Sequence, residues 1–432
     1  MLGIFKKKPR TVVVGLDGVP YGLITSLASM GVMPAMAKLI DQGRIAPMAS
    51  AIPEISSIAW STVITGKNPG EHGILGFMEL APGSYALSFP NFKALRTDTF
   101  WDRVPDKTCA VLNVPSTYPA RKMNGVLIAG FVALDLADAT WPKDLVPALE
   151  KRDYRLDVNA RLGHKDMLAF LADLDYTLDA RIETYRWLWK KEAWDLFMAV
   201  FTGTDRLMHF LFEAWSDEGH EHREAFLAHF RKIDGFLAWL VGEMGKDDTL
   251  LMLSDHGFER LEHEVYVNAL LRQWGFLTLD KEPPDGYENI AKGTRAFALD
   301  PARLYVHVEG KYPRGSVPAG ERAKVVSELK EAFGALEIEG RKPVKAMFEA
   351  SEVYEGPEVS RAADLILLSE PGFDLKATLR ETDSHGRRVF TGKHTQPDAF
   401  LFLKPGPGAG ASMPEKPSVQ DVAGILLQSL GS

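Results

Sequence analysis

Short apolar runs of β-branched and aliphatic residues alternate with longer helix-like stretches along most of this chain. The runs that read as strands are 11–16, 108–114, 125–131, 196–201, 249–254, 364–368 and 399–403. Helix-like stretches include 58–65, 177–192 and 221–244, and a last helix is expected at about 418–430. Such alternation is typical of a layered α/β domain with a parallel-rich sheet. In sheets of this kind, ligands bind beyond the carboxyl ends of the strands.

Two stretches interrupt this alternation. Residues 135–176 mix short helical pieces with polar turns, and 280–360 contains Pro- and Gly-rich segments that suit surface connections. We therefore expect a core formed by 9–275 and 361–432, with a small insertion at 135–176 and a cap-like insertion at 280–360. Loops on a rigid scaffold commonly shape the entrance to a binding site.

Composition excludes several classes of protein. The 432 residues are 46% hydrophobic, which is enough to bury a large core. The net charge of −8 is spread without long basic blocks, so a dedicated nucleic-acid surface is not expected. The run Lys6–Lys8 is read as a solvated tail, and no apolar run reaches the ~18 residues of a membrane span. The single cysteine, Cys109, fits a reducing compartment, and we expect a cytoplasmic protein whose oligomeric state is open.

Acidic and imidazole side chains occur in two pairs, one at the end of a strand-like run and one at helical spacing. Asp255 and His256 end the run 249–254, and such a pair at a strand end suggests metal ligation. Asp205 and His209 stand four residues apart, so a helix would place both on one face. A turn-forming Asp in the first case, and a capping Asp with a core His in the second, are the structural alternatives.

Three further positions supply related chemistry. Asp17 follows the strand-like run 11–16 into a turn, and His394 is a loop histidine that precedes the run 399–403. Ser56 and Ser57 stand just before the helix-like stretch 58–65, and a helix N-terminus favours both anion binding and a developing alkoxide. Each of these residues, taken alone, also has an ordinary reading as a turn former, a surface histidine or a helix cap.

In this order along the chain, the features resemble the alkaline phosphatase superfamily, most closely its type I phosphodiesterase and nucleotide pyrophosphatase branch. In that family the nucleophile lies nine residues before the Thr of a Thr-Gly pair, which corresponds here to Ser56, given Thr65–Gly66. The likeness also covers Ala59–Trp60, Asn68–Gly70, His72–Ile74, Asn113–Pro115, Thr117–Pro119 and Glu264–Asn268.

The resemblance implies a three-layer α/β/α core around a mostly parallel sheet, with insertions near the active site. It implies two divalent cations, Zn²⁺ or alternatively Mn²⁺, in keeping with mixed nitrogen and oxygen ligands. One cation would be held by Asp205, His209 and His394, and the other by Asp17, Asp255 and His256. The implied activity is hydrolysis of a small-molecule phosphoester, of the phosphodiesterase kind, through a phospho-Ser56 intermediate.

One departure from the family pattern affects the expected substrate. Phe77 stands where the nucleotide pyrophosphatases carry an Asn that contacts the phosphoryl oxygen, and Asn91, Lys93 and Asn113 are the polar candidates to replace that contact. The Cys/Ser-x-Pro-x-Arg signature of the sulfatases is not present at Ser56. A phosphomutase or phosphonate-processing enzyme of the same superfamily, and a catalytically degenerate anion-binding protein, remain as alternatives.

Overall fold

The structure is a computed structural model that describes residues 8–431, so Lys6 and Lys7 of the basic run lie outside the described residues. The chain forms two compact units. The first comprises the chain through Lys67, residues 91–258 and the chain from His394 onward. The second comprises Asn68–Pro90 and Glu259–Lys393. The strands β10 (Gly257–Arg260) and β18 (Gly392–Thr395) include two of the points where the chain passes between units.

An eight-stranded sheet forms the centre of the first unit. Its order is β2 (Arg44–Met48), β19 (Ala399–Lys404), β9 (Thr249–Leu253), β1 (Thr11–Leu16), β8 (Leu196–Phe201), β5 (Cys109–Val114), β6 (Gly125–Ala129) and β7 (Thr140–Trp141). The five strands from β9 to β6 are parallel, while β19 and β7 run antiparallel to their neighbours. The predicted α/β class with a mostly parallel sheet is therefore confirmed.

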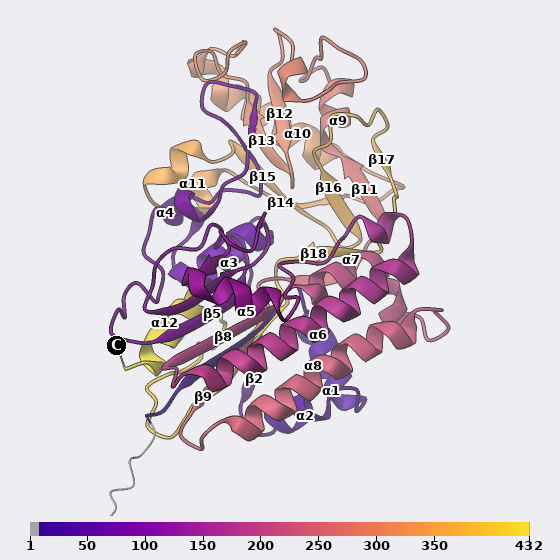
Figure 1. The fold of residues 1–432 in the computed structure, drawn as a ribbon. Coiled ribbons are helices and arrows are strands. Elements are labelled where there is room, and N and C mark those ends of the chain that lie inside the picture. Colours follow the sequence, from indigo (N-terminus) through magenta and orange to yellow (C-terminus); the bar gives the residue numbers. More distant parts are fainter. Residues whose placement is uncertain (1–7, 432) are drawn as a thin grey trace, which may run out of the picture. The chain divides into compact units, whose positions relative to one another are not determined.

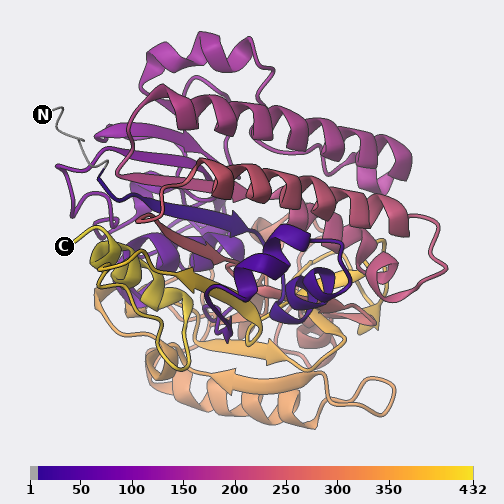
Figure 2. The same cartoon turned by 90° about the horizontal axis from the view of Figure 1, so that it is seen from below.

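The central strands are buried along nearly their whole length because helices cover the sheet. All six residues of β1 and of β8 are buried, as expected for parallel strands covered on both faces. The long helices α6 (Met167–Lys191) and α8 (Arg223–Glu243) lie side by side along the sheet (Figures 1 and 2). A second pair, α3 (Ser56–Thr65) and α12 (Val422–Ser429), is also in contact. A Cβ at Gly15 would come within 2.6 Å of the Trp60 ring, so glycine lets α3 approach β1 closely.

Shorter helices connect the strands of the first unit. They are α1 (Tyr21–Ser29), α2 (Pro34–Ile40), α5 (Val146–Glu150) and α7 (Gly203–Ser216). Within residues 8–431, no single helix is both long and apolar enough to cross a membrane, and α1 with α2 meets that requirement only as a pair bent by 108°.

The second unit is built on antiparallel pairing. One sheet has the order β12 (Ala296–Leu299), β13 (Arg303–Val306), β15 (Leu365–Ser369) and β14 (Val344–Phe348), and α10 (Arg322–Ala335) contacts it. A smaller sheet has the order β16 (Phe373–Lys376), β11 (His263–Tyr266) and β17 (His385–Gly386). The remaining elements are α4 (Pro69–His72), β3 (Glu79–Leu80), β4 (Leu87–Ser88), α9 (Val267–Gln273) and α11 (Ala350–Val353).

The second unit is larger than the insertion expected at 280–360. Residues 68–90, 259–279 and 361–393 also belong to it. The strand expected at 364–368 forms as β15, but it pairs with β13 and β14 instead of joining the eight-stranded sheet. An apolar run predicts a buried strand without specifying which sheet buries it. The helix expected at 177–192 begins earlier, at Met167, because Asp166 caps it by accepting a hydrogen bond from the Ala169 amide at 3.0 Å.

Candidate active site

The seven residues expected to form the site all belong to the first unit. Asp17 follows β1, Asp255 and His256 follow β9, and these two parallel strands are neighbours. Asp205 and His209 lie on α7, which begins just after β8 on the other side of β1. Because β19 runs antiparallel to β9, its beginning lies at the same edge, shortly after His394. The topology thus places these residues at the carboxyl edge of the parallel strands.

Asp205, His209 and His394 form a first cluster of ligand atoms. His394 Nε2 lies 3.0 Å from His209 Nε2 and 3.1 Å from Asp205 Oδ1, and His209 Nε2 lies 3.4 Å from Asp205 Oδ1. For comparison, tetrahedral zinc with bonds of ~2.0–2.2 Å separates its ligand atoms by about 3.3–3.6 Å. His394 Nδ1 lies 2.9 Å from the Glu54 carbonyl, which keeps the proton on Nδ1 and turns the Nε2 lone pair toward the cluster.

Asp17, Asp255, His256 and Ser56 form a second cluster. His256 Nε2 lies 3.4 Å from Asp255 Oδ2 and 3.7 Å from Asp17 Oδ1. Ser56 Oγ lies 3.1 Å from His256 Nε2 and 3.4 Å from Asp17 Oδ1. The Gly257 carbonyl, 3.0 Å from His256 Nδ1, holds this second imidazole in the same tautomer as His394.

One carboxylate oxygen of the second cluster is buried and accepts no hydrogen bond from residues 8–431. Asp255 Oδ2 finds no hydrogen-bond partner among residues 8–431, whereas Asp255 Oδ1 accepts from the Gly18 amide at 3.1 Å. An unpaired buried carboxylate oxygen is costly, and a bound cation would remove that cost. The two clusters adjoin, since the rings of His256 and His394 stack with centroids 3.7 Å apart. These residues therefore fit two neighbouring divalent cations.

The buried charges perturb one another strongly. Burial raises the pKa of Asp17 well above its ordinary value, and the neighbouring Asp255 and Asp205 raise it further. Burial likewise raises the pKa of Asp255 to about 7. Burial lowers the pKa of His256 to about 4 and also lowers that of His394. Neutral imidazoles are the form that a cation binds, and the repelling carboxylates are what a cation would stabilise.

The pKa of Asp205 moves the other way. Burial alone would raise it, but the contacts with His209 and His394 outweigh burial and hold the pKa well below its ordinary value. The Arg206 guanidinium also donates to Asp205 Oδ2 at 3.2 Å and to Asp157 Oδ2 at 2.8 Å. Arg206 thus links Asp205 to the segment 135–176. Its role was not predicted, because an Arg next to an Asp on a helix does not face it by spacing alone.

Two aromatic side chains also support the site and were not predicted to do so. The Trp60 indole donates to Asp17 Oδ2 at 3.0 Å, which fixes the orientation of this carboxylate. The Phe258 ring packs edge-on against the rings of His209 and His394, with centroid distances of 4.9 and 5.1 Å. In the sequence, only the position of Trp60 four residues after Ser56, on the same face of the expected helix, indicates this contact.

The expected substrate-binding residues fall into two groups. Asn113 is fully buried, and its amide donates to the Val200 carbonyl at 3.2 Å and to Thr202 Oγ1 at 3.3 Å. The side-chain amide of Asn113 therefore joins β5 to β8 and to Thr202, the residue that follows β8. Asn91 and Lys93 are exposed, and the Asn91 side chain caps a short turn by accepting from the Lys93 amide at 3.0 Å.

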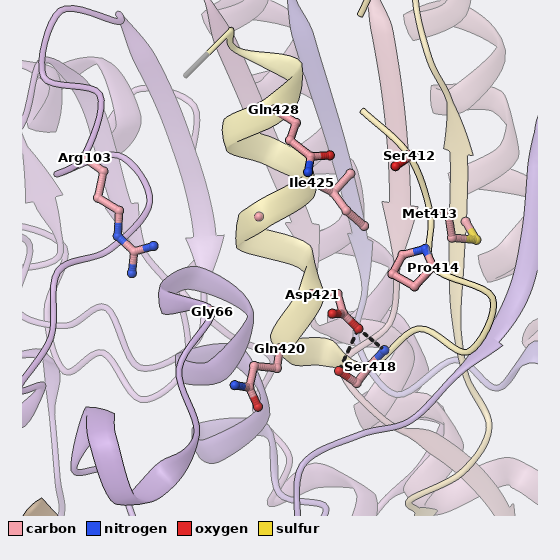
Figure 3. Close-up of a pocket in the computed structure, with 11 residues that line it drawn as sticks. Gly66, Arg103, Ser412, Met413, Pro414, Ser418, Gln420, Asp421, Ile425 and Gln428 are labelled. Atoms are coloured by element: carbon pink, nitrogen blue, oxygen red, sulfur yellow. Dashed lines mark hydrogen bonds between the residues drawn. The ribbon is translucent and has the colours of Figure 1, made fainter. Parts of the chain in front are cut away.

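A separate pocket lies beside α12 in the same unit (Figure 3). It measures about 600 Å³ and is lined by Arg103, Gln420, Asp421, Gln428 and neighbouring residues, none of which belongs to the two clusters. The Asp421 carboxylate is already used, since it accepts from the Ser418 amide at 2.8 Å and from the Ser418 hydroxyl at 2.9 Å. Pocket size therefore does not locate the chemistry here, and the ligand clusters do.

Comparison with known proteins agrees with this geometry. The model of a family described as type I phosphodiesterase / nucleotide pyrophosphatase matches residues 11–395. Phosphonoacetate hydrolase from Sinorhizobium meliloti 1021, solved with phosphonoformate and with phosphonoacetate, is 17% identical with a TM-score of 0.66, covering 98% of this chain and 96% of that chain. A search among curated proteins finds no match.

A second group of solved structures is similar at lower scores. Murine ectonucleotide pyrophosphatase / phosphodiesterase 5 is 14% identical with a TM-score of 0.55, covering 98% of this chain and 95% of that chain. The human protein of the same name is 14% identical with a TM-score of 0.56 over the same shares. At these identities the likeness establishes the fold, and it confirms the alkaline-phosphatase-like architecture expected from the sequence.

Proposed function

Because the chain belongs to the type I phosphodiesterase and nucleotide pyrophosphatase family, whose members are metal-dependent phosphoester hydrolases, we propose that it hydrolyses a small phosphoester with two divalent cations and Ser56. The observation that carries this proposal is the second cluster. There an unpartnered buried oxygen of Asp255, the Nε2 of His256 and the hydroxyl of Ser56 face one another. A buried carboxylate oxygen without a hydrogen-bond partner is costly, and a cation bound beside it would offset that cost.

The cations, when bound, would lower the pKa of the serine hydroxyl and neutralise charge on the phosphoryl oxygens. Ser56 Oγ, after losing its proton to solvent, would attack phosphorus and form phospho-Ser56. The bond from phosphorus to the leaving oxygen would break, and the departing alkoxide would take up a proton from solvent. Water would then hydrolyse this ester, releasing the phosphoryl group and restoring the hydroxyl. Trp60 and Phe258 would keep the carboxylate of Asp17 and the imidazoles in place during both steps.

The position of Ser56 at the start of α3 supports its role as the nucleophile. It is the first residue of the helix, and the amides of a first helical turn have no partners within the helix. Those amides and the helix dipole favour negative charge next to Ser56, where the phosphoryl oxygens would lie. Ser57 is the next residue on the same helix, but its hydroxyl is buried and makes no hydrogen bond within residues 8–431.

The substrate is proposed to be a phosphoester other than a simple nucleotide diester. This rests on Phe77, which stands where the nucleotide pyrophosphatases carry a phosphoryl-contacting Asn. Losing a donor of this kind commonly costs about 3–4 kcal/mol of transition-state stabilisation. A phosphonate is the second candidate, because the solved phosphonoacetate hydrolase shares the fold over nearly the whole of both chains.

The test combines metal analysis with a substrate panel on the purified protein. Bound metals would be counted, and turnover would be measured with chromogenic phosphate monoesters and diesters, nucleoside triphosphates, dinucleotides and phosphonoacetate. We expect two catalytic cation equivalents and chelator-sensitive turnover of an ester outside the nucleotide group. Robust hydrolysis of dinucleotides would refute the proposed substrate preference, and binding of anions without any turnover would instead support the degenerate alternative.

A further inference from the structure

Two histidines outside the candidate active site lie together on one face of the small sheet in the second unit. His263 begins β11, and His385 begins β17 and pairs with Val265, two residues along β11 from His263. Residues two apart on a strand share a face, so His263 and His385 are diagonal neighbours. Their rings meet edge to face with centroids 5.8 Å apart.

A tight turn brings a carboxylate to the same place. Ile338 and Arg341 exchange backbone hydrogen bonds of 2.8 and 3.0 Å, which leaves Glu339 and Gly340 at the tip with φ of 50° and 76°. Two successive positive φ values define a type I′ turn, in which the first tip residue rarely carries a long side chain. The Glu339 side chain projects from this tip toward the two histidines.

The turn is anchored to the histidine face by a second set of contacts. The Arg341 guanidinium donates to the Pro371 carbonyl at 2.8 Å, pairs with the Glu262 carboxylate and lies 4.7 Å from the centroid of the Phe373 ring. The His263 ring also stacks on Phe373, with centroids 5.4 Å apart and planes 24° apart. These contacts hold Glu339 close to His263.

The ligand atoms have the spacing of a cation site. His263 Nε2 lies 3.6 Å from Glu339 Oε2, and His385 Nε2 lies 3.9 Å from Glu339 Oε1. All three ligands offer atoms within 4.8 Å of one another. These separations exceed the ~2.7–3.2 Å of a hydrogen bond. They are close to the separation of about 3.3–3.6 Å between ligand atoms of tetrahedral zinc, so a small inward movement would complete the site.

A hydrogen bond with Ser384 leaves the ring of His385 suited to bind a cation. The Ser384 hydroxyl lies 2.9 Å from His385 Nδ1 and can accept a hydrogen bond from it, which leaves the Nε2 lone pair for a cation. The site is also accessible, since the side chains of His263, His385 and Glu339 are 21%, 33% and 64% exposed. Two imidazoles and a carboxylate suit Zn²⁺, with water in the fourth position.

We propose that His263, Glu339 and His385 bind a Zn²⁺ ion that is separate from the two cations of the candidate active site. The ion would join β11, β17 and the turn at 338–341, which are distant in the sequence, and would thereby stabilise the second unit. This site shares no residue with the two catalytic clusters. The proposal therefore does not depend on the proposed phosphoester hydrolysis.

The test compares the full-length protein with Glu339→Gln and His385→Asn, and uses Glu337→Gln as the control. Glu337 is exposed, two residues from Glu339, and is not among the clustered ligands. Each protein would be loaded with Zn²⁺, passed through a desalting column with a weak chelator and analysed for zinc by mass spectrometry. We expect Glu339→Gln and His385→Asn each to retain one equivalent fewer than the unaltered chain and Glu337→Gln.

The deciding quantity is the difference of one zinc equivalent between the ligand variants and the control. This difference is expected whether or not the catalytic clusters retain zinc. Zn²⁺ should also raise the melting temperature of Glu337→Gln by more than that of Glu339→Gln. Glu339 is largely exposed, so its replacement should fold even if His385→Asn does not. Equal zinc content in Glu339→Gln and Glu337→Gln would overturn the proposal, as would loss of the extra equivalent from the unaltered protein in the weak chelator.

Discussion

Replacing Trp60 by Phe should weaken cation binding at the second cluster while leaving the nucleophile and every ligand in place. The Trp60 indole is fully buried and donates to Asp17 Oδ2 at 3.0 Å. Phe keeps an aromatic ring against Gly15 but removes the donor. The indole also lowers the pKa of Asp17, opposing the effect of burial, so its loss favours a protonated carboxyl that competes with the cation.

The expected size of the effect follows from this single contact. A hydrogen bond to a charged group contributes about 1.5–3 kcal/mol. Because 1.4 kcal/mol corresponds to a factor of ten, the Kd of the second cation should rise about 10- to 100-fold. Loss of an outer contact to a metal ligand typically weakens metal affinity by the same about 10- to 100-fold. The cation held by Asp205, His209 and His394 should be little affected, because Trp60 does not contact that cluster.

Trp194→Phe is the matched control. Trp194 is also buried in the first unit, and its indole donates to the Leu188 carbonyl at 2.8 Å, away from both clusters. Metal-depleted proteins would be titrated with Zn²⁺ against a chromophoric chelator, and the melting temperature would be recorded for each. Both variants should lose stability, but only Trp60→Phe should lose affinity for one cation. Equal affinities in the two variants would refute the role assigned to the indole.

Three further predictions concern the nucleophile, pH and a buried ion pair. Ser56→Ala should lower kcat by several orders of magnitude and still bind metal, whereas Ser57→Ala should lower kcat much less. Equal losses of kcat in the two variants, measured in steady-state assays, would show that the nucleophile is misplaced. Burial raises the pKa of Asp255 to about 7 and that of Asp17 well above its ordinary value, so cation binding below pH 7 must release at least one proton. The affinity should therefore rise with pH by about tenfold per unit or more up to about pH 7. The pKa of His256 and that of His394 are lowered, so neither imidazole should contribute to this release, and calorimetry in two buffers that finds no proton release at pH 6 would contradict the assignment. Arg206→Met should destabilise the metal-free protein by about 3–5 kcal/mol, because Asp157 and Asp205 lose a buried partner, and should destabilise the metal-loaded protein less, since a cation replaces the missing charge; equal losses in denaturant unfolding would argue against this.

Local patterns in the sequence predicted the central sheet, whereas the grouping of the seven residues was implied by the family resemblance. An apolar run that ends in Asp17 or Asp255 specifies a strand and the side chain at its end. The spacing of Asp205 and His209 specifies one helix face. The topology then brings these ends together, because parallel strands share one carboxyl edge.

Features that depend on the packing of distant segments were not predictable in this way. Asn113 carries a polar side chain of the kind that often contacts ligands. In the folded chain it is buried, and its amide donates hydrogen bonds to Val200 and Thr202. Phe258 lies close to His256 in sequence, yet its contacts with His209 and His394 require the folded edge of the sheet. His263 and His385 showed no pattern that related them, because only the pairing of β11 with β17 makes them neighbours.

The most direct test of the two-cation site is diffraction from crystals of the zinc-loaded protein, measured on both sides of the zinc absorption edge. Two anomalous peaks about 3.5–4 Å apart should appear at the carboxyl edge of the sheet. One peak should lie among Asp205, His209 and His394, and the other among Asp17, Asp255 and His256, within bonding distance of Ser56 Oγ. A single peak at this edge of the sheet, or no peak in contact with these six side chains, would contradict the account.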